Sequence, residues 1–245
     1  MNESTRNDGQ DCDDDMRPDE AATSWVSPGS LAARYLDCLL ASDRAAATRL
    51  IDAAMAAGLS IRALYLDVIQ QTQREIGRLW ELGRVSVAQE HFCTGVSQLV
   101  IARLYPSWLK APDPDAPRAL VTCANRELHE LGARMVADFL ELDGWDTLYL
   151  GASSPPRAVA ALLRERQTDL IAISCTMTTH LDAVAQLIDA VRALPASSQP
   201  RILVGGYAFA QDEHAWRRLG ADGHARDADD AVHVSRALMS PAQPS

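Results

Sequence analysis

The fold is decided by a short apolar run, Ala119-Leu120-Val121-Thr122-Cys123, and by the segment that follows it, Glu127-Leu128-His129-Glu130-Leu131-Gly132. After this segment apolar residues recur at helical spacing, at Val136, Phe139 and Leu140. An apolar run that gives way to a period of about 3.6 residues predicts a strand leading into a helix. His129 then lies in the loop at the carboxyl end of the strand, which is where open α/β sheets bind ligands.

The alternation of strand and helix continues to the end of the chain. Strand-like runs at 118–123, 146–150, 169–174, 201–205 and 222–225 alternate with helical patterns at 130–143, 156–166, 179–193, 208–219 and 227–239. Such alternation implies right-handed crossovers between parallel strands. Residues 118–240 are therefore predicted to form an α/β domain, a five-stranded doubly wound parallel sheet of the flavodoxin-like, Rossmann type, in the order 2-1-3-4-5.

Residues 30–110 show the apolar spacing of helices throughout, with helical segments at 30–41, 44–57, 60–82 and 86–109. Asp43 and Ser60 stand where N-caps belong, Gly58 follows the second segment as a stop signal, and Ser86-Val87-Ala88-Gln89 has the form of a capping box. Pro106 should end or kink the last helix. Short connections between amphipathic helices predict an antiparallel four-helix bundle, and the proline-rich residues 111–117 are predicted to link it to the sheet domain.

Charge and composition exclude several classes of protein. The chain has 245 residues and a net charge of −10, and residues 1–20 account for six of those charges, so an acidic, disordered tail is expected over 1–29. The remainder has no basic stripe, which argues against direct binding to nucleic acid. Five separate cysteines without a CxxC pair, no apolar stretch of about 18 residues and no signal peptide predict a cytoplasmic protein without a membrane segment.

Three loops share one edge of the predicted sheet, because the first, third and fourth strands are neighbours in the order 2-1-3-4-5. They are Glu127 to Gly132, Ser174-Cys175-Thr176, and Gly205-Gly206. The edge thus combines an imidazole, two hydroxyls and a stretch where the backbone can be approached closely. This combination suits a long ligand with a polar tail, and the first loop lacks the glycine-rich turn of a simple phosphate site.

The pattern Glu127-x-His129-x-x-Gly132, 41 residues, Ser174-x-Thr176, 28 residues, Gly205-Gly206 resembles the signature of cobalamin-binding domains of the methionine-synthase type. The resemblance implies that His129 coordinates cobalt in place of the dimethylbenzimidazole base. The nucleotide tail of the cofactor would then lie beside Ser174, Thr176, Gly205 and Gly206. Imidazole is a fitting ligand for a transition metal, and Glu127 is expected to accept its other N–H and so fix the tautomer.

The helical half carries a second motif. Trp80, nine residues, then Glu90-His91 resembles the Wx9EH pattern of cobalamin-binding light sensors related to the carotenoid-gene repressors. This implies that the bundle caps the upper face of adenosylcobalamin, with Trp80 against the adenosyl group and Glu90 and His91 close by. Some stand-alone members of this family also bind a bilin, for which the sequence identifies no site.

Two features depart from those sensors. Residues 1–29 are too short and too acidic for the helix-turn-helix domain of the MerR type that the gene regulators carry. Many sensors also have a histidine directly after the tryptophan, where this chain has Glu81. His91 and His180 are then the candidates for a second cobalt ligand, although His180 is expected to be a solvent-facing residue in the first turn of a helix.

The sequence therefore predicts a light sensor that is not an enzyme. Photolysis of the Co–C bond would change domain packing and so control self-association or binding of a protein partner. The alternative is a corrinoid protein that carries methyl groups for a methyltransferase system. A methyl carrier must leave the upper face open, which Trp80 with Glu90 and His91 argues against. A subunit of a radical mutase is a third interpretation, but the chain lacks a barrel for the substrate.

Overall fold

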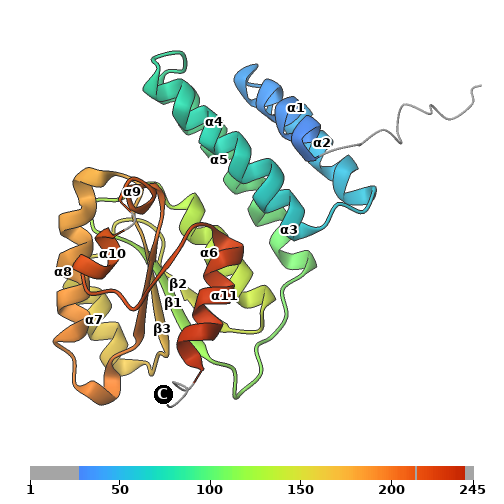
Figure 1. Cartoon of the computed structure of the whole chain (residues 1–245). Helices are drawn as coiled ribbons and strands as arrows, with labels where there is room; N and C mark the ends of the chain where they lie inside the picture. The colour runs from blue at the N-terminus through green and yellow to red at the C-terminus, as the bar shows by residue number, and fades with distance from the viewer. Residues whose placement is uncertain (1–27, 213, 241–245) are drawn as a thin grey trace, which may run out of the picture.

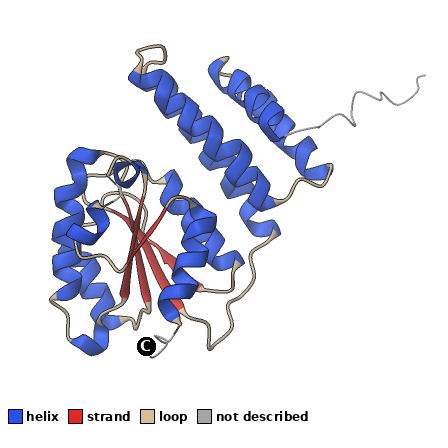
Figure 2. Cartoon of the chain, in the orientation of Figure 1, coloured by secondary structure: helices blue, strands red, loops and turns tan. Residues whose placement is uncertain are grey.

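The structure is a computed structural model that describes residues 28–212 and 214–240. The predicted acidic tail therefore lies outside the described residues, apart from Pro28 and Gly29, which begin the first helix. A helical half precedes an α/β half (Figures 1 and 2). No helix in the described ranges combines the length and the apolar character that crossing a bilayer requires.

The helical half is the predicted four-helix bundle. Its elements are α1 (Pro28–Leu40), α2 (Arg44–Ala56), α3 (Ile61–Ala63), η2 (Leu64–Ile69), α4 (Gln70–Glu81), α5 (Val87–Leu104) and the 3-10 turn η3 (Tyr105–Ser107). The predicted caps are confirmed: Asp43 accepts the N–H of Ala46 at 2.8 Å, Ser60 accepts that of Ala63 at 3.1 Å, and Ser86 forms the capping box with Gln89.

The third helix differs from the prediction because its segment η2 is π-helical. A π-helix has a wider turn than an α-helix, and proteins use it in short pieces. Four of the six η2 residues are buried, and one of them, Tyr65, extends to the α/β half. The helical period of the sequence alone did not reveal this segment.

The α/β half confirms the predicted fold class and strand order. Its strands are β1 (Arg118–Cys123), β2 (Asp146–Tyr149), β3 (Leu170–Ser174), β4 (Arg201–Gly205) and β5 (Gly223–Ala225), all parallel, in the order β2-β1-β3-β4-β5. The main helices are α6 (Leu131–Leu142), α7 (Pro156–Glu165), α8 (Leu181–Arg192) and α11 (Ala228–Met239), with 3-10 turns η4 (Thr178–His180) and η5 (Ala196–Ser198).

Each face of the sheet has its own apolar layer. Leu120, Ile171 and Val204 pack with α7 and α8, whereas the alternate residues Val121 and Ala172 pack with α6 and α11. Alternation of this kind follows from the two-residue period of a strand. Figure 1 shows the resulting helix, sheet and helix layers.

The predicted helix over 208–219 is wrong. The structure has two short helices there, α9 (Tyr207–Ala210) and α10 (Ala215–Arg218). Between them the Asp212 carboxylate accepts the backbone N–H of His214 at 3.0 Å and also binds Arg218. A side chain that takes a backbone donor competes with helical hydrogen bonding, so Asp212 favours a turn over a continuous helix.

The two halves meet along α6. The Tyr65 hydroxyl donates to Asp138 at 2.8 Å, Arg134 binds the other oxygen of Asp138 at 2.6 Å, and the Tyr105 hydroxyl donates to Glu141 at 2.7 Å. Asp138 is buried, and burial raises the pKa of its carboxyl to about 6 despite Arg134. These contacts hold α4 and α5 diagonally above the carboxyl ends of the strands (Figure 1).

Candidate functional site

The three predicted loops do meet at one edge of the sheet. Cys123 of β1 is level with Ser174 of β3, and Ser174 is level with Gly205 of β4, so the loops leave the sheet side by side. The first two loops are joined by a hydrogen bond in which the backbone N–H of Thr176 donates to Glu127 at 2.9 Å. Three loops that are separated in the sequence by 41 and 28 residues therefore form one continuous rim.

Glu127 and His129 form the centre of this rim. Glu127 is completely buried, and its Oε1 accepts both the backbone N–H of His129 at 3.0 Å and the ring Nδ1–H at 2.5 Å. The expected contact between the two side chains is thus confirmed. Since Nδ1 is engaged, Nε2 is the ring nitrogen with a free lone pair, and the His129 side chain remains 47% exposed.

Charge at the rim is set by hydrogen bonds. Burial raises the pKa of the Glu127 carboxyl, but hydrogen bonds from His129, Met177 and Thr176 outweigh it and hold that pKa well below its ordinary value. The hydrogen bond from His129 to Glu127 raises the pKa of the imidazole, and the charge of Glu90 on α5 raises it further. Glu90 of the bundle is therefore close enough to His129 of the rim for its charge to raise the pKa of the imidazole.

The small residues of the rim have two different roles. A Cβ on Gly206, whose φ is +103°, would lie 2.4 Å from the carbonyl oxygen of Cys175, and one on Gly205 would lie 2.8 Å from that of Ala225. Both positions therefore require glycine, because any side chain would collide with the backbone at the end of a neighbouring strand. A Cβ on Gly132 would meet no atom within 4 Å, so that surface is open.

The hydroxyls of Ser174 and Thr176 are available to a ligand. Both residues are partly buried, and in the described part of the chain neither side-chain oxygen has a protein hydrogen-bond partner. The strand-end capping that such residues commonly perform is therefore not their role here.

The bundle residues lie where the sequence predicted, at the end of α4 and in the first turns of α5. Trp80 is 38% exposed, one of several large apolar side chains on the surface of the described residues. Glu90 accepts the Thr94 hydroxyl at 2.7 Å and pairs with His91 Nδ1 at 2.5 Å. Glu90 and His91 are therefore joined directly, whereas Trp80 makes no ring contact with another aromatic or cationic side chain of the described residues.

His180 is the residue that sequence reasoning misplaced. It is not a solvent-facing residue of the helix, because its Nδ1 lies 3.3 Å from Glu127 Oε2 and its side chain is only 21% exposed. The two residues are 53 positions apart, so only the strand order brings them together. Their adjacent loops were the one signal in the sequence for this contact.

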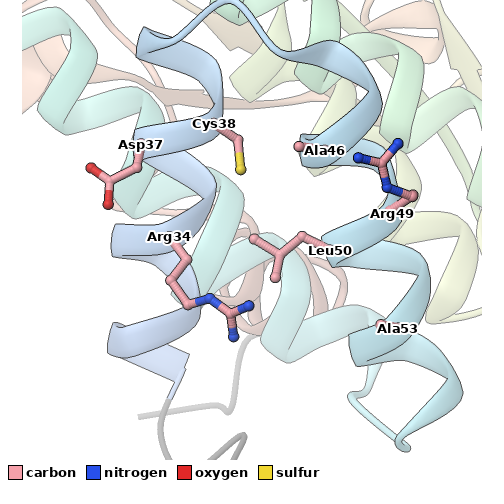
Figure 3. Close-up of a pocket in the computed structure, with 7 residues that line it drawn as sticks. All are labelled: Arg34, Asp37, Cys38, Ala46, Arg49, Leu50 and Ala53. Carbon is pink, nitrogen blue, oxygen red and sulfur yellow. The ribbon is translucent and has the colours of Figure 1, made fainter. Parts of the chain in front are cut away.

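A groove of about 440 Å³ lies elsewhere, between α1 and α2. Figure 3 shows the side chains of Arg34, Asp37 and Cys38 on one helix opposite Arg49 and Leu50 on the other. None of the residues predicted for the ligand site lines this groove. It is therefore distinct from the rim.

Comparison with known proteins identifies both halves. Residues 117–233 match the B12 binding domain family, and residues 31–105 match a second family of the same description. The chain carries a pair of B12-binding domains. Within the described residues no group of three or more histidine, cysteine or acidic side chains could hold a free metal ion.

The B12-binding pair resembles proteins of two kinds. It is 24% identical over 220 residues to trimethylamine corrinoid protein 1 of Methanosarcina acetivorans, a match that covers 87% of this chain and 99% of the relative. It is 27% identical over 157 residues to the HTH-type transcriptional repressor CarA of Myxococcus xanthus, covering 64% of this chain and 53% of the repressor. The chain thus spans about half the length of CarA.

Its fold is shared with the monomethylamine corrinoid protein of Methanosarcina barkeri. The TM-score is 0.77 at 20% identity, and the match covers 87% of this chain and all of that protein. The arrangement of bundle and sheet is therefore that of a corrinoid protein.

Proposed function

We propose that this protein binds cobalamin on the rim, with His129 Nε2 as the protein ligand of cobalt. One observation carries the proposal: buried Glu127 engages Nδ1 of His129 and leaves Nε2 exposed above the strand ends. A carboxylate behind a ligating histidine is the usual support for a metal ligand. The free hydroxyls of Ser174 and Thr176 and the open surface at Gly132 fit the polar periphery of the cofactor.

The role that the comparisons support best is that of a corrinoid protein carrying methyl groups for a methyltransferase partner. Its support is the match over nearly the whole of a corrinoid protein, together with the shared arrangement of both domains. Bound cobalamin would supply a cobalt atom able to accept and release a methyl group. The chain's own part is to hold the cofactor through His129 and to present it toward a protein partner.

A light sensor is the second candidate, favoured by Trp80 and the Glu90–His91 pair. The exposed Trp80 ring offers an apolar surface at the end of α4. The negative charge of Glu90, on the next helix, raises the pKa of His129. His91 pairs with a carboxylate through Nδ1 and is 73% exposed, so its Nε2 is free like that of His129. His180 lies on the Glu127 side of the site, which leaves His91 as the candidate for a second ligand. In this role adenosylcobalamin is the expected form, and illumination would alter self-association or partner binding.

The two roles differ in which cobalamin binds and what light does. The protein is loaded in the dark with methylcobalamin or adenosylcobalamin, and the Kd, absorbance spectrum and mass by light scattering are measured before and after illumination. A methyl carrier binds the methyl form at least as tightly and keeps its mass in the light. A sensor prefers the adenosyl form, changes mass or shape on illumination, and loses that preference in Trp80→Ala.

The ligand assignment has its own control. His129→Ala should change the spectrum of bound cobalamin in either role, because imidazole coordination shifts the cobalt absorption bands. An identical spectrum in His129→Ala and the unmodified protein would refute His129 as the ligand.

A further inference from the structure

Helix α5 carries a polar stripe on a side that packs inside the bundle. Its members are Glu90, Thr94 and Ser97, which lie along one side of the helix because they are spaced four and three residues apart. Ser97 is completely buried, and the Glu90 side chain is only 19% exposed. Polar groups in such a position need hydrogen-bond partners within the protein.

Gln73 of α4 connects this stripe to α1. Its Nε2 donates to Ser97 Oγ at 2.8 Å and to the Cys93 carbonyl at 3.4 Å, and because a carbonyl oxygen can only accept, the amide has one orientation. The amide oxygen therefore faces the Thr94 hydroxyl, 3.0 Å away. The Ser97 hydroxyl in turn bonds the buried Tyr35 hydroxyl of α1 at 3.1 Å. A chain of hydrogen bonds thus runs from α5 through α4 to α1.

The Thr94 hydroxyl stands between two acceptors. Its oxygen lies 2.7 Å from Glu90 Oε1 and 3.0 Å from Gln73 Oε1, and a hydroxyl has one hydrogen to donate. The carboxylate attracts that hydrogen more strongly, because hydrogen bonds to charged acceptors are about twice as strong as neutral ones. A change that neutralises Glu90, or gives it another donor, releases the hydrogen to Gln73.

The Gln73 amide passes this change on. When its oxygen accepts a hydrogen bond, its N–H becomes a stronger donor, since hydrogen bonds in a chain polarise one another. The bonds from Gln73 to Ser97 and from Ser97 to Tyr35 therefore respond to the direction of the Thr94 hydroxyl.

We propose that Thr94 and Gln73 are positioning residues for the Glu90 carboxylate, and that their chain carries the state of Glu90 to Tyr35 on α1. Glu90 is also the bundle residue whose charge reaches His129 of the rim. A ligand on the rim thus acts on the near end of the chain. This link to the cofactor rests on the proposed function, whereas the chain itself does not.

The test follows Tyr35 while Glu90 is changed, in the full chain without cofactor. The five tyrosines are labelled with carbon-13 at Cζ, whose NMR shift reports the hydrogen bonding of the hydroxyl, and Tyr35→Phe assigns the signal. Glu90→Gln replaces the charged acceptor with a neutral one, so the Thr94 hydroxyl should turn toward Gln73. The Tyr35 signal should then move.

Variants that interrupt the chain give the decisive comparison. Thr94→Val keeps the shape of the side chain without its hydroxyl, and Gln73→Met keeps the length without the amide. In either background Glu90→Gln should leave the Tyr35 signal unmoved. Thr94→Ser retains a hydroxyl and should restore the movement, which a merely structural role of Thr94 would not require.

Thr48→Val is the matched control. The Thr48 hydroxyl donates to a carbonyl of its own helix, α2, at 2.8 Å and lies outside the chain. In this background Glu90→Gln should move the Tyr35 signal as far as in the unmodified protein.

Three results would overturn the proposal. The first is a Tyr35 signal that Glu90→Gln leaves in place in the otherwise unmodified chain. The second is a movement that survives in both interrupted backgrounds, and the third is Thr94→Ser behaving like Thr94→Val. If Thr94→Val does not fold by circular dichroism, the comparison with Gln73→Met decides.

Hydroxocobalamin tests the link to the rim. Its binding, followed by absorbance, should move the Tyr35 signal in the unmodified chain and leave it in place in Gln73→Met. If the cofactor binds and Tyr35 does not respond, the link between rim and chain is overturned. If hydroxocobalamin does not bind, the proposed function fails, while the cofactor-free comparison with Glu90→Gln still decides the role of the chain.

Discussion

Replacing Glu127 with glutamine tests the centre of the site without changing its shape. The wild-type carboxylate accepts five hydrogen bonds and donates none. Glutamine has one acceptor oxygen and one NH2 group. If its oxygen takes the place of Oε2 and keeps three donors, its NH2 group faces the two N–H groups of His129. The imidazole can then accept only by moving its proton to Nε2, which removes the lone pair needed for a metal.

The size of the stability loss in Glu127→Gln follows from the hydrogen-bond donors that are left without an acceptor. Even after the tautomer of His129 reverses, its backbone N–H faces the NH2 group with no acceptor, and an unsatisfied buried donor costs about 1–3 kcal/mol. The three donors on Oε2 also lose a charged acceptor. Glu127→Gln should therefore lower the free energy of unfolding of the cofactor-free protein by about 2–4 kcal/mol at pH 7. Cobalamin affinity should fall about 10- to 100-fold.

The pH dependence gives a second check. Hydrogen bonds from His129, Met177 and Thr176 outweigh burial and lower the pKa of Glu127 in the folded state. Its stabilisation is therefore complete above the ordinary pKa of 4.5 and is lost as the pH falls below that value toward the folded-state pKa. Since the glutamine variant has no carboxylate, the difference in stability between the two proteins should narrow below about pH 4.5.

Urea unfolding followed by circular dichroism, at pH 7 and at steps down to pH 3, measures both effects. Glu127→Ala is not a suitable substitute, because it adds a cavity to the loss of hydrogen bonds. A difference below about 0.5 kcal/mol at pH 7, or one that stays constant as the solution is acidified, would refute this account of Glu127.

Further predictions concern the glycines, the interface and a helix cap. Gly206→Ala should lower the free energy of unfolding by more than about 2 kcal/mol, because its φ is +103° and its Cβ would meet the Cys175 carbonyl; Gly77→Ala, in α4 with no atom within 4 Å, should raise it by about 0.5–1 kcal/mol in the same urea measurement. Burial raises the pKa of Asp138 to about 6, so the protonated carboxyl stabilises the folded state fully below the ordinary pKa of 3.8, and this stabilisation is lost as the pH rises through 6. Asp138→Asn should abolish this loss of stability, which urea midpoints measured between pH 4 and pH 7 will show. Ser86→Ala removes the capping box of α5, so it should lower the free energy of unfolding by about 1 kcal/mol and speed hydrogen exchange in the first turn of that helix.

Local signals predicted much of the fold. Asp43, Ser60 and Ser86 mark helix starts through hydrogen bonds that reach only three residues along the chain, so the sequence contains the whole cause. The strand order followed from the alternation of strands and helices. The pairing of Glu127 with His129 was also predictable, because the two residues are neighbours in one loop.

Contacts between distant residues were not predictable in the same way. Tyr65 and Asp138 are 73 positions apart, and the π-helical turn that presents Tyr65 has no local signature in the sequence. His180 meets Glu127 only after the sheet has aligned the two loops. The break at Asp212 reflects competition between a side chain and the helix backbone, which a hydrophobic period does not register.

Helix α6 connects the rim to the bundle. It begins at Leu131, two residues after His129, and Asp138, the anchor for Tyr65 of the bundle, lies about 10 Å further along its axis. The bundle also reaches the loop itself, since Gln98 of α5 donates to Glu130, the residue after His129, at 3.1 Å. A change in the packing of the bundle is therefore expected to reach the loop of His129 by two protein routes, through α6 and through Glu130, neither of which involves the ligand.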